Sequence, residues 1–199
     1  MKDWLNNFES DAEQILEEVL AARLDNPRSR RLRREIVRRF AALLLTDDER
    51  ARLLGLPEGC RVRESAKIIG GERLKCDGHV WIGENAVVDA SGGLEIGEHT
   101  TIGTGAFVWS HTSVLASLLH DNRSGNDLIV RKPTRIGRGV YVGGPSVVNP
   151  GIDIGEGAVI LPMTVVTRDV TAGKIVAGSP GRERGDADAE FVARLRRQL

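Results

Sequence analysis

The stretch IGRGVYVGGPSVVNPGIDIGEGAVILPMTVVTRDV, residues 136–170, repeats with a period of six. A Val or Ile returns at every sixth position, and a small or β-branched residue follows four positions after each. A strand alternates with period two and a helix with period 3.6, so neither gives this pattern. A six-residue repeat is typical of a parallel β-helix, in which three flat faces close a coil of about eighteen residues. The first series is Ile136, Val142, Val148, Ile154, Ile160 and Val166, and the second is Val140, Ser146, Ile152, Ala158, Thr164 and Val170.

The same register extends upstream of one interruption at about 115–134. A two-residue slip at DASGG, residues 89–93, separates the clear repeats from weaker ones nearer the N-terminus. We therefore expect about five coils, three before the interruption and a little over two after it. The upstream series is Val62, Ile68, Leu74, Ile82, Val88, Ile96, Ile102, Val108 and Val114, with Thr100, Ala106 and Thr112 at the small positions.

The composition agrees with a turn-rich fold whose core is built from small and β-branched residues. Of 199 residues, 41% are hydrophobic but only 4% are aromatic, and 23 are glycines. Basic and acidic residues balance at 28 each, so the net charge gives no reason to expect nucleic acid or an anionic membrane as a partner. With only Cys60 and Cys76, no export signal and no apolar span, we expect a cytoplasmic protein with reduced thiols.

Residues 3 to about 54 are expected to be helical, because apolar side chains recur there at three- and four-residue spacings. Pro27 suits the start of a second helix, and Thr46 suits the N-cap of a short third one. The first helix is acidic and the second has seven arginines between Arg28 and Arg39. An arginine-rich helix can bind nucleic acid, but we favour a helical hairpin whose charges face each other or solvent. The expected organisation is a helical region over 1–58, a β-helix over 59–182 and a helical tail over 183–199.

IGEHTTIGTGAFVW (96–109), residues 135–162 and the closing TVVTRDVTAGKIVAGSPGR (164–182) resemble the hexapeptide-repeat acyltransferases, in particular the sugar O-acetyltransferase branch. The resemblance covers residues 62 to about 182 and not the helical N-terminus. It implies a left-handed β-helix, against the usual right-handed crossover. It also implies a homotrimer with active sites between neighbouring subunits. The implied reaction moves an acetyl group from acetyl-coenzyme A to a hydroxyl or amine, and the implied acceptor is a sugar-like small molecule.

A thioester is already activated, so such an enzyme needs a base for the acceptor, a donor for the oxyanion and alignment. The interruption would supply the concave surface that a closed prism lacks. The resemblance implies one histidine as the general base, near the loop that leaves the prism. His111 is favoured because it lies three residues after Val108, while His120 lies deeper in the loop and is the second candidate. Either could instead be a surface histidine, and Asp121 could orient one of them.

The resemblance also implies the residues that contact coenzyme A. Thr167 and Arg168 match a threonine–basic pair whose cation would meet a phosphate. Pro162 departs from the pattern, because relatives usually have a small residue with a free N–H there and proline cannot donate. The six matched positions are Tyr141, Gly144, Pro162, Thr167, Arg168 and Arg182. The acceptor cannot be identified, although Asn122, Arg123, Asn126 and Asp127 of the loop suit hydrogen bonding to a polyol.

Two other classes remain open. A β-helical carbonic anhydrase holds a metal with three histidines, and His79 and His99 fall at equivalent positions one coil apart. The closely spaced second ligand of that class is missing, so we expect a stacked surface pair and no metal. A non-catalytic β-helix that binds sugars or nucleotides is the other alternative, and a loop without a base would favour it.

Overall fold

The computed structural model describes residues 27–121 and 128–198, together with residues 7, 10, 11 and 14. It divides the chain into two compact units, Met1–Thr46 and Asp47–Leu199. The boundary lies before the third helix, whereas the expected helical region extended to residue 58. The predicted first helix over residues 3–24 and its pairing with the second lie almost wholly outside the described residues.

The helices near the N-terminus follow the sequence pattern where they are described. Helix α2 runs over Pro27–Ala42 and begins at the proline, as expected. Helix α3 runs over Asp47–Leu53 and begins directly after Thr46. It belongs with the β-helix, because the buried Arg50 donates through Nε to the Val62 carbonyl at 2.9 Å. Helix α3 therefore covers the open end of the first coil.

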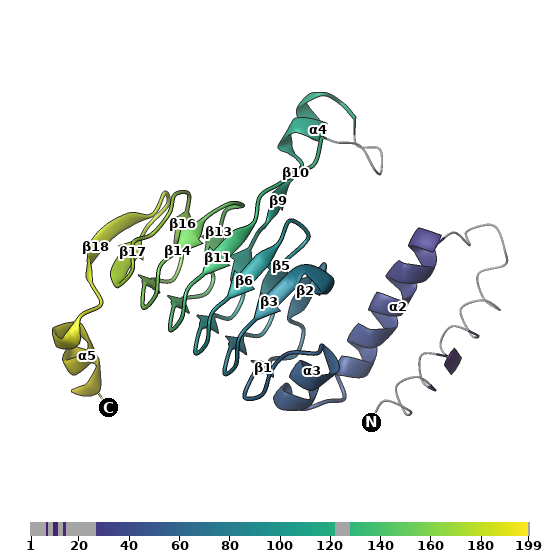
Figure 1. The fold of residues 1–199 in the computed structure, drawn as a ribbon, viewed down its shortest axis with the longest axis horizontal. Helices are drawn as coiled ribbons and strands as arrows, with labels where there is room; N and C mark the ends of the chain where they lie inside the picture. Colours follow the sequence, from purple (N-terminus) through teal and green to yellow (C-terminus); the bar gives the residue numbers. More distant parts are fainter. Residues whose placement is uncertain (1–6, 8–9, 12–13, 15–26, 122–127, 199) are drawn as a thin grey trace. The chain divides into compact units, whose positions relative to one another are not determined.

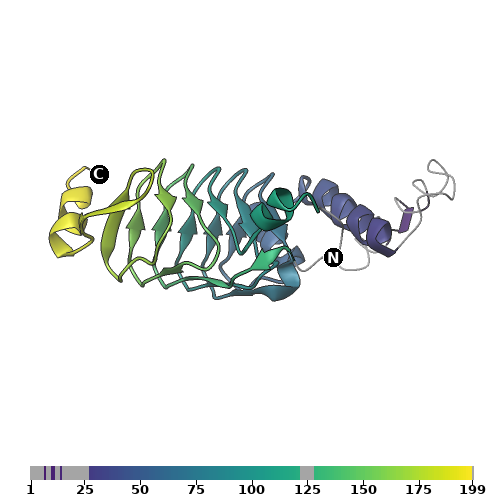
Figure 2. The same cartoon turned by 90° about the horizontal axis from the view of Figure 1, so that it is seen from above.

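The second unit is a left-handed parallel β-helix whose strands form three faces (Figures 1 and 2). Face 1 holds β1 (Arg61–Val62), β4 (Trp81–Ile82), β7 (Thr101–Ile102), β12 (Tyr141–Val142), β15 (Val159–Ile160) and β17 (Lys174–Ala177). Face 2 holds β2 (Lys67–Ile69), β5 (Val87–Asp89), β8 (Phe107–Val108), β13 (Val147–Val148) and β16 (Val165–Val166). Face 3 holds β3 (Leu74–Cys76), β6 (Leu94–Ile96), β11 (Thr134–Ile136) and β14 (Asp153–Ile154).

The core is the axis of the prism, and the six-residue series lines it. Val142, Val148 and Ile160 are fully buried, and Ala158 and Thr164 fill the small positions with no exposure. Burying these branched side chains in a close-packed column is the main favourable term in forming each coil. The prediction of a hexapeptide β-helix is therefore confirmed.

The coils differ in length along the prism. Val142 pairs with Ile160, eighteen residues later, as the repeat predicts. Upstream, Ile82 pairs with Val62 and with Ile102, twenty residues away on each side. The early coils are longer because each carries extra residues at the corner between faces 2 and 3, which accounts for the slip at 89–93. Face 1 stacks six strands, one more than the expected five coils, because β17 adds a last turn.

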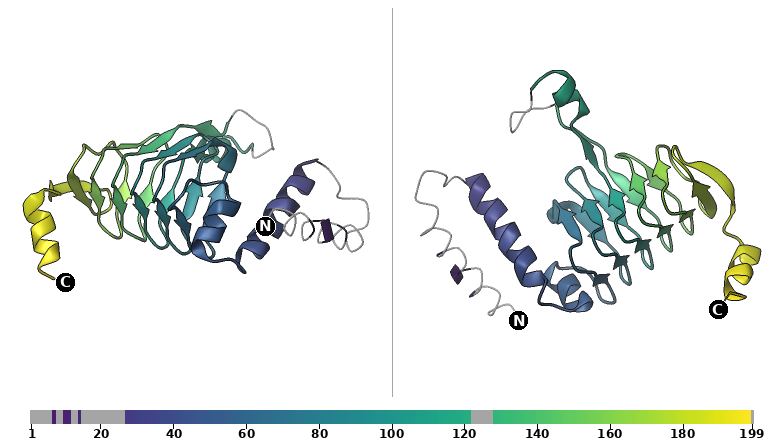
Figure 3. Two further views of the ribbon diagram at one scale, coloured as in Figure 1. Left: turned by 60° about the horizontal axis from the view of Figure 1, so that its bottom comes forward. Right: turned by 180° about the vertical axis from the view of Figure 1, so that it is seen from behind.

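The interruption lies between face 2 and face 3 of the third coil. The chain leaves as β9 (His111–Thr112), forms helix α4 (Val114–Leu118), and returns antiparallel as β10 (Val130–Arg131). The hairpin stands off the prism in Figure 1 and in the right-hand view of Figure 3. The expected core position of Val114 is wrong, because Val114 is 61% exposed and opens α4. The coil closes instead through the next residues of face 3, where Thr134 is fully buried and Ile136 pairs with Ile96.

The C-terminal end contains a strand that the sequence pattern did not predict. Strand β18 (Arg182–Asp186) pairs antiparallel with β17, and only then does helix α5 (Ala189–Arg196) begin. The Asp188 carboxylate caps α5 by accepting from the Phe191 amide at 2.9 Å. The expected helical tail therefore starts at residue 189 and not at 183.

Candidate active site

The corner where the chain leaves the prism holds His111, and the preceding coil places a carboxylate under it. Val88 of β5 pairs with Val108 of β8, so the residues that follow these two positions also lie side by side. Asp89 follows Val88 directly and is fully buried. His111 stands three residues beyond Val108, and its side chain is 28% exposed. The register of the coils thus brings together an acid and an imidazole that are 22 residues apart in the chain.

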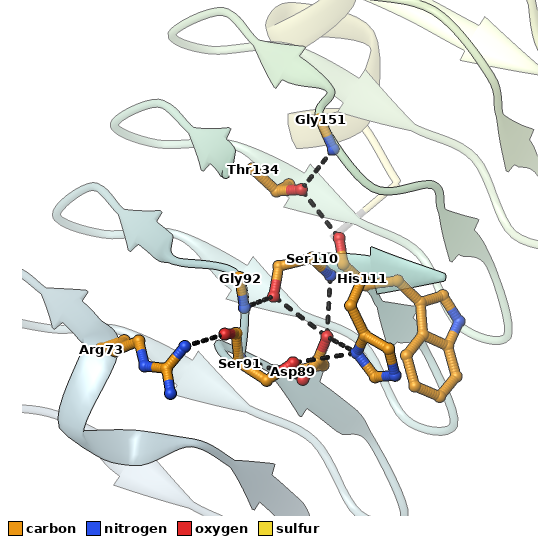
Figure 4. A network of polar contacts seen from close by, with 9 residues as sticks. Arg73, Asp89, Ser91, Gly92, Ser110, His111, Thr134 and Gly151 are labelled. Carbon is orange, nitrogen blue, oxygen red and sulfur yellow. Dashed lines mark hydrogen bonds and ion pairs between the residues drawn. The ribbon is translucent and has the colours of Figure 1, made fainter. Parts of the chain in front are cut away.

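Asp89 and His111 form a close hydrogen-bonded pair (Figure 4). His111 Nδ1 lies 2.7 Å from Asp89 Oδ2 and 2.9 Å from Ser91 Oγ. A carboxylate can only accept, so the hydrogen lies on Nδ1 and the lone pair on Nε2. A neutral imidazole held in this tautomer has its basic nitrogen on the side away from Asp89. The arrangement is that of a general base with an orienting carboxylate.

Asp89 is held by several donors, and three of them converge on one oxygen. Besides His111, Oδ2 accepts from the Ser110 amide at 2.9 Å and from Ser110 Oγ at 3.0 Å. The other oxygen, Oδ1, accepts from the Ser91 amide at 3.0 Å. Burial by itself raises the pKa of the Asp89 carboxyl, but the bonds from Ser110, Ser91 and His111 outweigh it and hold that pKa below its ordinary value. Asp89 is therefore ionised at neutral pH although no solvent reaches it.

The backbone around this pair is fixed from both sides (Figure 4). Ser110 Oγ accepts from the Gly92 amide at 2.8 Å, and a Cβ at Gly92 would overlap the Ser110 carbonyl oxygen. On the other side, Thr134 Oγ1 donates to the Trp109 carbonyl at 2.7 Å and accepts from the Gly151 amide at 3.0 Å. The residue before His111 and the residue before that are thus each tied to a neighbouring coil. This network limits how far the imidazole can move.

Sequence reasoning named His111 and missed Asp89, Ser110 and Thr134. The two-residue slip at 89–93 was the available signal, because it marks a coil corner of different shape next to the interruption. His120, the second candidate, is exposed at the end of α4, and among the described residues its side chain has no polar contact. The carboxylate that contacts His111 is Asp89, whereas Asp121 is adjacent to His120 in sequence.

The six residues matched to coenzyme A contacts fall into two groups. Thr167, Arg168 and Arg182 line one hollow of about 250 Å³, beside β16 at the C-terminal end of the prism. Thr167 and Arg168 form the corner between faces 2 and 3 that His111 occupies two coils earlier. The other three residues lie on face 1 and at its corner with face 2, namely Tyr141, Gly144 and Pro162. Tyr141 is 44% exposed. One chain therefore does not bring all six together.

His79 and His99 are stacked, with ring centroids 4.9 Å apart and planes 15° from parallel. This confirms the expected pairing of equivalent positions in successive coils. In the part of the chain that the structure describes, no three His, Cys, Asp or Glu side chains are grouped so that they could hold a metal ion. Within the same residues, no helix combines the length and the apolar character that crossing a bilayer requires.

Comparison with known proteins gives relatives in sequence, although no family model matches the chain. The chain is 36% identical over 87 residues to the putative acetyltransferase YvoF of Bacillus subtilis, covering 43% of this chain and 46% of that protein. It is 28% identical over 159 residues to the putative colanic acid biosynthesis acetyltransferase WcaF of Escherichia coli, covering 77% and 80%. The chain thus spans less than half of the first relative and four fifths of the second.

Solved structures resemble the fold over most of the chain. A hexapeptide-repeat acetyltransferase from Vibrio cholerae matches with a TM-score of 0.58 at 22% identity, covering 92% of this chain and 93% of that one. That protein has also been solved with acetyl-coenzyme A. The N-acyltransferase AntD from Bacillus cereus, in complex with dTDP-4-amino-4,6-dideoxyglucose and coenzyme A, matches with a TM-score of 0.54 at 15% identity, covering 76% and 95%. At these identities the likeness concerns the fold alone.

Proposed function

Because this chain belongs to the hexapeptide-repeat acyltransferases, we propose that it transfers an acetyl group from acetyl-coenzyme A to a hydroxyl or amine of a sugar-like acceptor. His111 is the proposed general base. The observation that carries the proposal is the pairing of His111 with the buried Asp89, at the corner where the prism is interrupted. A pair of this kind serves proton transfer, and the fold supplies no reason for it otherwise.

In the proposed reaction, His111 Nε2 removes the proton of the acceptor hydroxyl as its oxygen attacks the thioester carbonyl. The tetrahedral intermediate then expels the thiolate of coenzyme A, and the imidazolium returns the proton to that sulfur. The products are the acetylated acceptor and free coenzyme A, and the enzyme is unchanged. Asp89 stabilises the positive charge that His111 acquires, because it stays ionised and hydrogen-bonded to Nδ1 throughout.

Acetyl-coenzyme A is the proposed acyl donor, and the hollow at the C-terminal end suits part of it. Arg168 and Arg182 are exposed there beside Thr167, and guanidinium groups bind phosphates through paired hydrogen bonds. The corner between faces 2 and 3 leads from this hollow toward His111. A long cosubstrate could therefore lie along that corner with its thioester near the imidazole.

A homotrimer is the proposed assembly, and the outer surfaces of the prism support it. Face 3 carries an alternating ladder of charges on its outside, from Lys75 through Glu95 and Arg135 to Asp153. Faces 1 and 2 have apolar residues at the corresponding outward positions, and these are only half-buried. Such strips need cover, and a neighbouring copy would supply it. Packing between copies would also bring residues of face 1, such as Tyr141, near the His111 corner of another chain. The outward residues are Trp81, Val87, Phe107, Val147, Val159 and Val165.

The proposal is tested by following free thiol after acetyl-coenzyme A is mixed with a panel of sugars. His111→Ala should lower turnover by about 10²-fold or more while binding of coenzyme A stays nearly unchanged. His120→Ala is the matched control, since it removes an exposed imidazole from the same excursion, and it should keep the full rate. Loss of activity in the His120 variant but not in the His111 variant would overturn the assignment of the base. Absence of acyl transfer to any acceptor would overturn the proposed activity.

A further inference from the structure

The hairpin that leaves the prism places a cation beside the proposed base. In the β9–β10 pair, His111 lies directly opposite Arg131, and Thr112 lies opposite Val130. Side chains of directly opposed residues in an antiparallel pair project to the same side, with Cβ atoms about 4.5–5.5 Å apart. The guanidinium of Arg131 is therefore carried on the same side of the hairpin as the imidazole.

Arg131 differs from most other cations near the coils, because it has no ion pair among the described residues. Arg63, Arg135 and Arg138 each lie within 4.0 Å of a carboxylate, and Lys75 and Lys174 do as well. Arg131 is exposed and stands next to a second exposed cation, Lys132. The backbone amide of Lys132 donates to the Ser110 carbonyl at 2.8 Å, which fixes this segment against the residue before His111.

The carboxylate closest to this position is already occupied. Both oxygens of Asp89 accept hydrogen bonds, and the side chain is fully buried. An exposed pair of cations without a carboxylate costs nothing in water, but it repels other cations and attracts anions. Its position next to the base means that an anion bound there would belong to the molecule whose hydroxyl meets His111.

We propose that Arg131, supported by Lys132, binds an anionic group of the acceptor, so that the acceptor is a sugar carrying a carboxylate or a phosphate. This inference rests on the proposed function and names its substrate class. A guanidinium suits either group, because its planar fork donates two parallel hydrogen bonds. The phosphates of coenzyme A are the other possible anions, but the cations proposed for them, Arg168 and Arg182, line a hollow two coils away.

The experiment compares anionic acceptors, glucuronic acid and UDP-glucose, with the neutral acceptors methyl glucoside and maltose. In the unmodified protein, at least one anionic acceptor should be used with a kcat/KM about tenfold or more above the neutral ones. Arg131→Gln should lower that kcat/KM by about ten- to hundredfold, the loss expected for a charge-assisted hydrogen bond, while the KM for acetyl-coenzyme A stays unchanged. Arg131→Lys should recover part of it. Arg138→Gln, an exposed arginine on the opposite corner, is the matched control and should change nothing.

Equal use of neutral and anionic acceptors, an equal loss with both classes in Arg131→Gln, or a raised KM for acetyl-coenzyme A would overturn the inference. Calorimetric binding of glucuronic acid and UDP-glucose separates this inference from the proposed activity. If no acceptor releases thiol, tighter binding of either probe to the unmodified protein than to Arg131→Gln still supports the anion site, and the proposed transfer fails alone. Equal binding to both proteins, or binding to neither, overturns the site.

Discussion

Replacement of Asp89 by asparagine separates the charge of this residue from its hydrogen bonds. Three donors meet at Oδ2, from Ser110 and His111, and one donor from Ser91 meets Oδ1. The asparagine oxygen should take the place of Oδ2, because the reverse orientation would set an NH₂ group against those three donors. The new NH₂ group then faces the Ser91 amide, and this donor loses its partner.

The magnitude follows from this count. One buried donor left without an acceptor costs about 1–3 kcal/mol, and three bonds change from charge-assisted to neutral, which weakens each of them. We expect Asp89→Asn to lower the free energy of unfolding by about 2–4 kcal/mol at pH 7. The hydrogen on His111 Nδ1 keeps its acceptor, so the tautomer survives, but the imidazolium loses its counter-charge. Acyl transfer should therefore fall by roughly 10- to 10³-fold.

The pH dependence gives a second measurement. The pKa of Asp89 in the folded protein is lowered, so its stabilising contribution is complete above the ordinary aspartate pKa of about 3.9 and is lost as pH falls through the folded value. The difference in unfolding free energy between the two proteins should thus shrink between pH 7 and pH 3. Urea unfolding at both pH values measures it, with the exposed Asp153→Asn as control. A difference that stays constant with pH, or a variant with full activity, would refute the reasoning.

Three further predictions concern the frame around the site and the thiols. Gly92→Ala should lower the rate by about tenfold or more, because the new Cβ displaces the Ser110 carbonyl; an unchanged rate in the thiol-release assay would contradict it. Thr134→Val should lower the free energy of unfolding by about 1–3 kcal/mol, because Trp109 loses a donor at a buried carbonyl; chemical unfolding measures this, and a neutral effect speaks against the role. Burial, followed by the neighbouring Cys60 thiol, raises the pKa of Cys76 to about 12, so alkylation of Cys76 at pH 8 should be about 10³-fold slower in the folded than in the unfolded protein, and equal labelling rates would rule this out.

The core of the prism could be predicted from sequence because its period has a direct geometric cause. Each sixth residue points to the axis, and Val142 and Ile160 are buried as the count requires. The same count failed at Val114, which fits the spacing but lies in α4. A periodic count follows the chain, whereas burial depends on which coil lies next to the residue. Only the stacked register shows that the partner of Ile96 is Ile136, forty residues later.

The candidate site shows the same division between local and long-range information. His111 could be found because a histidine at the end of the regular pattern stands out in the sequence itself. Asp89 lies 22 residues earlier, in a segment that the count treated as a slip. Its burial and its contact with His111 both arise from the pairing of β5 with β8. No local pattern marks a carboxylate of this kind, because it becomes special only when two coils are stacked.

The return of the chain to its own stack after the excursion has an evolutionary consequence. Thr134 pairs with Leu94 and Ile136 with Ile96, so face 3 continues as if nothing had been inserted. The length and composition of the excursion are therefore free to drift without disturbing the scaffold, since closing a longer loop adds only a small entropic cost. A transplanted excursion that ends on the same two anchor points should carry its selectivity with it. Natural variation in the molecules that this scaffold modifies would then accumulate in one short segment, while the prism and its buried acid stay the same.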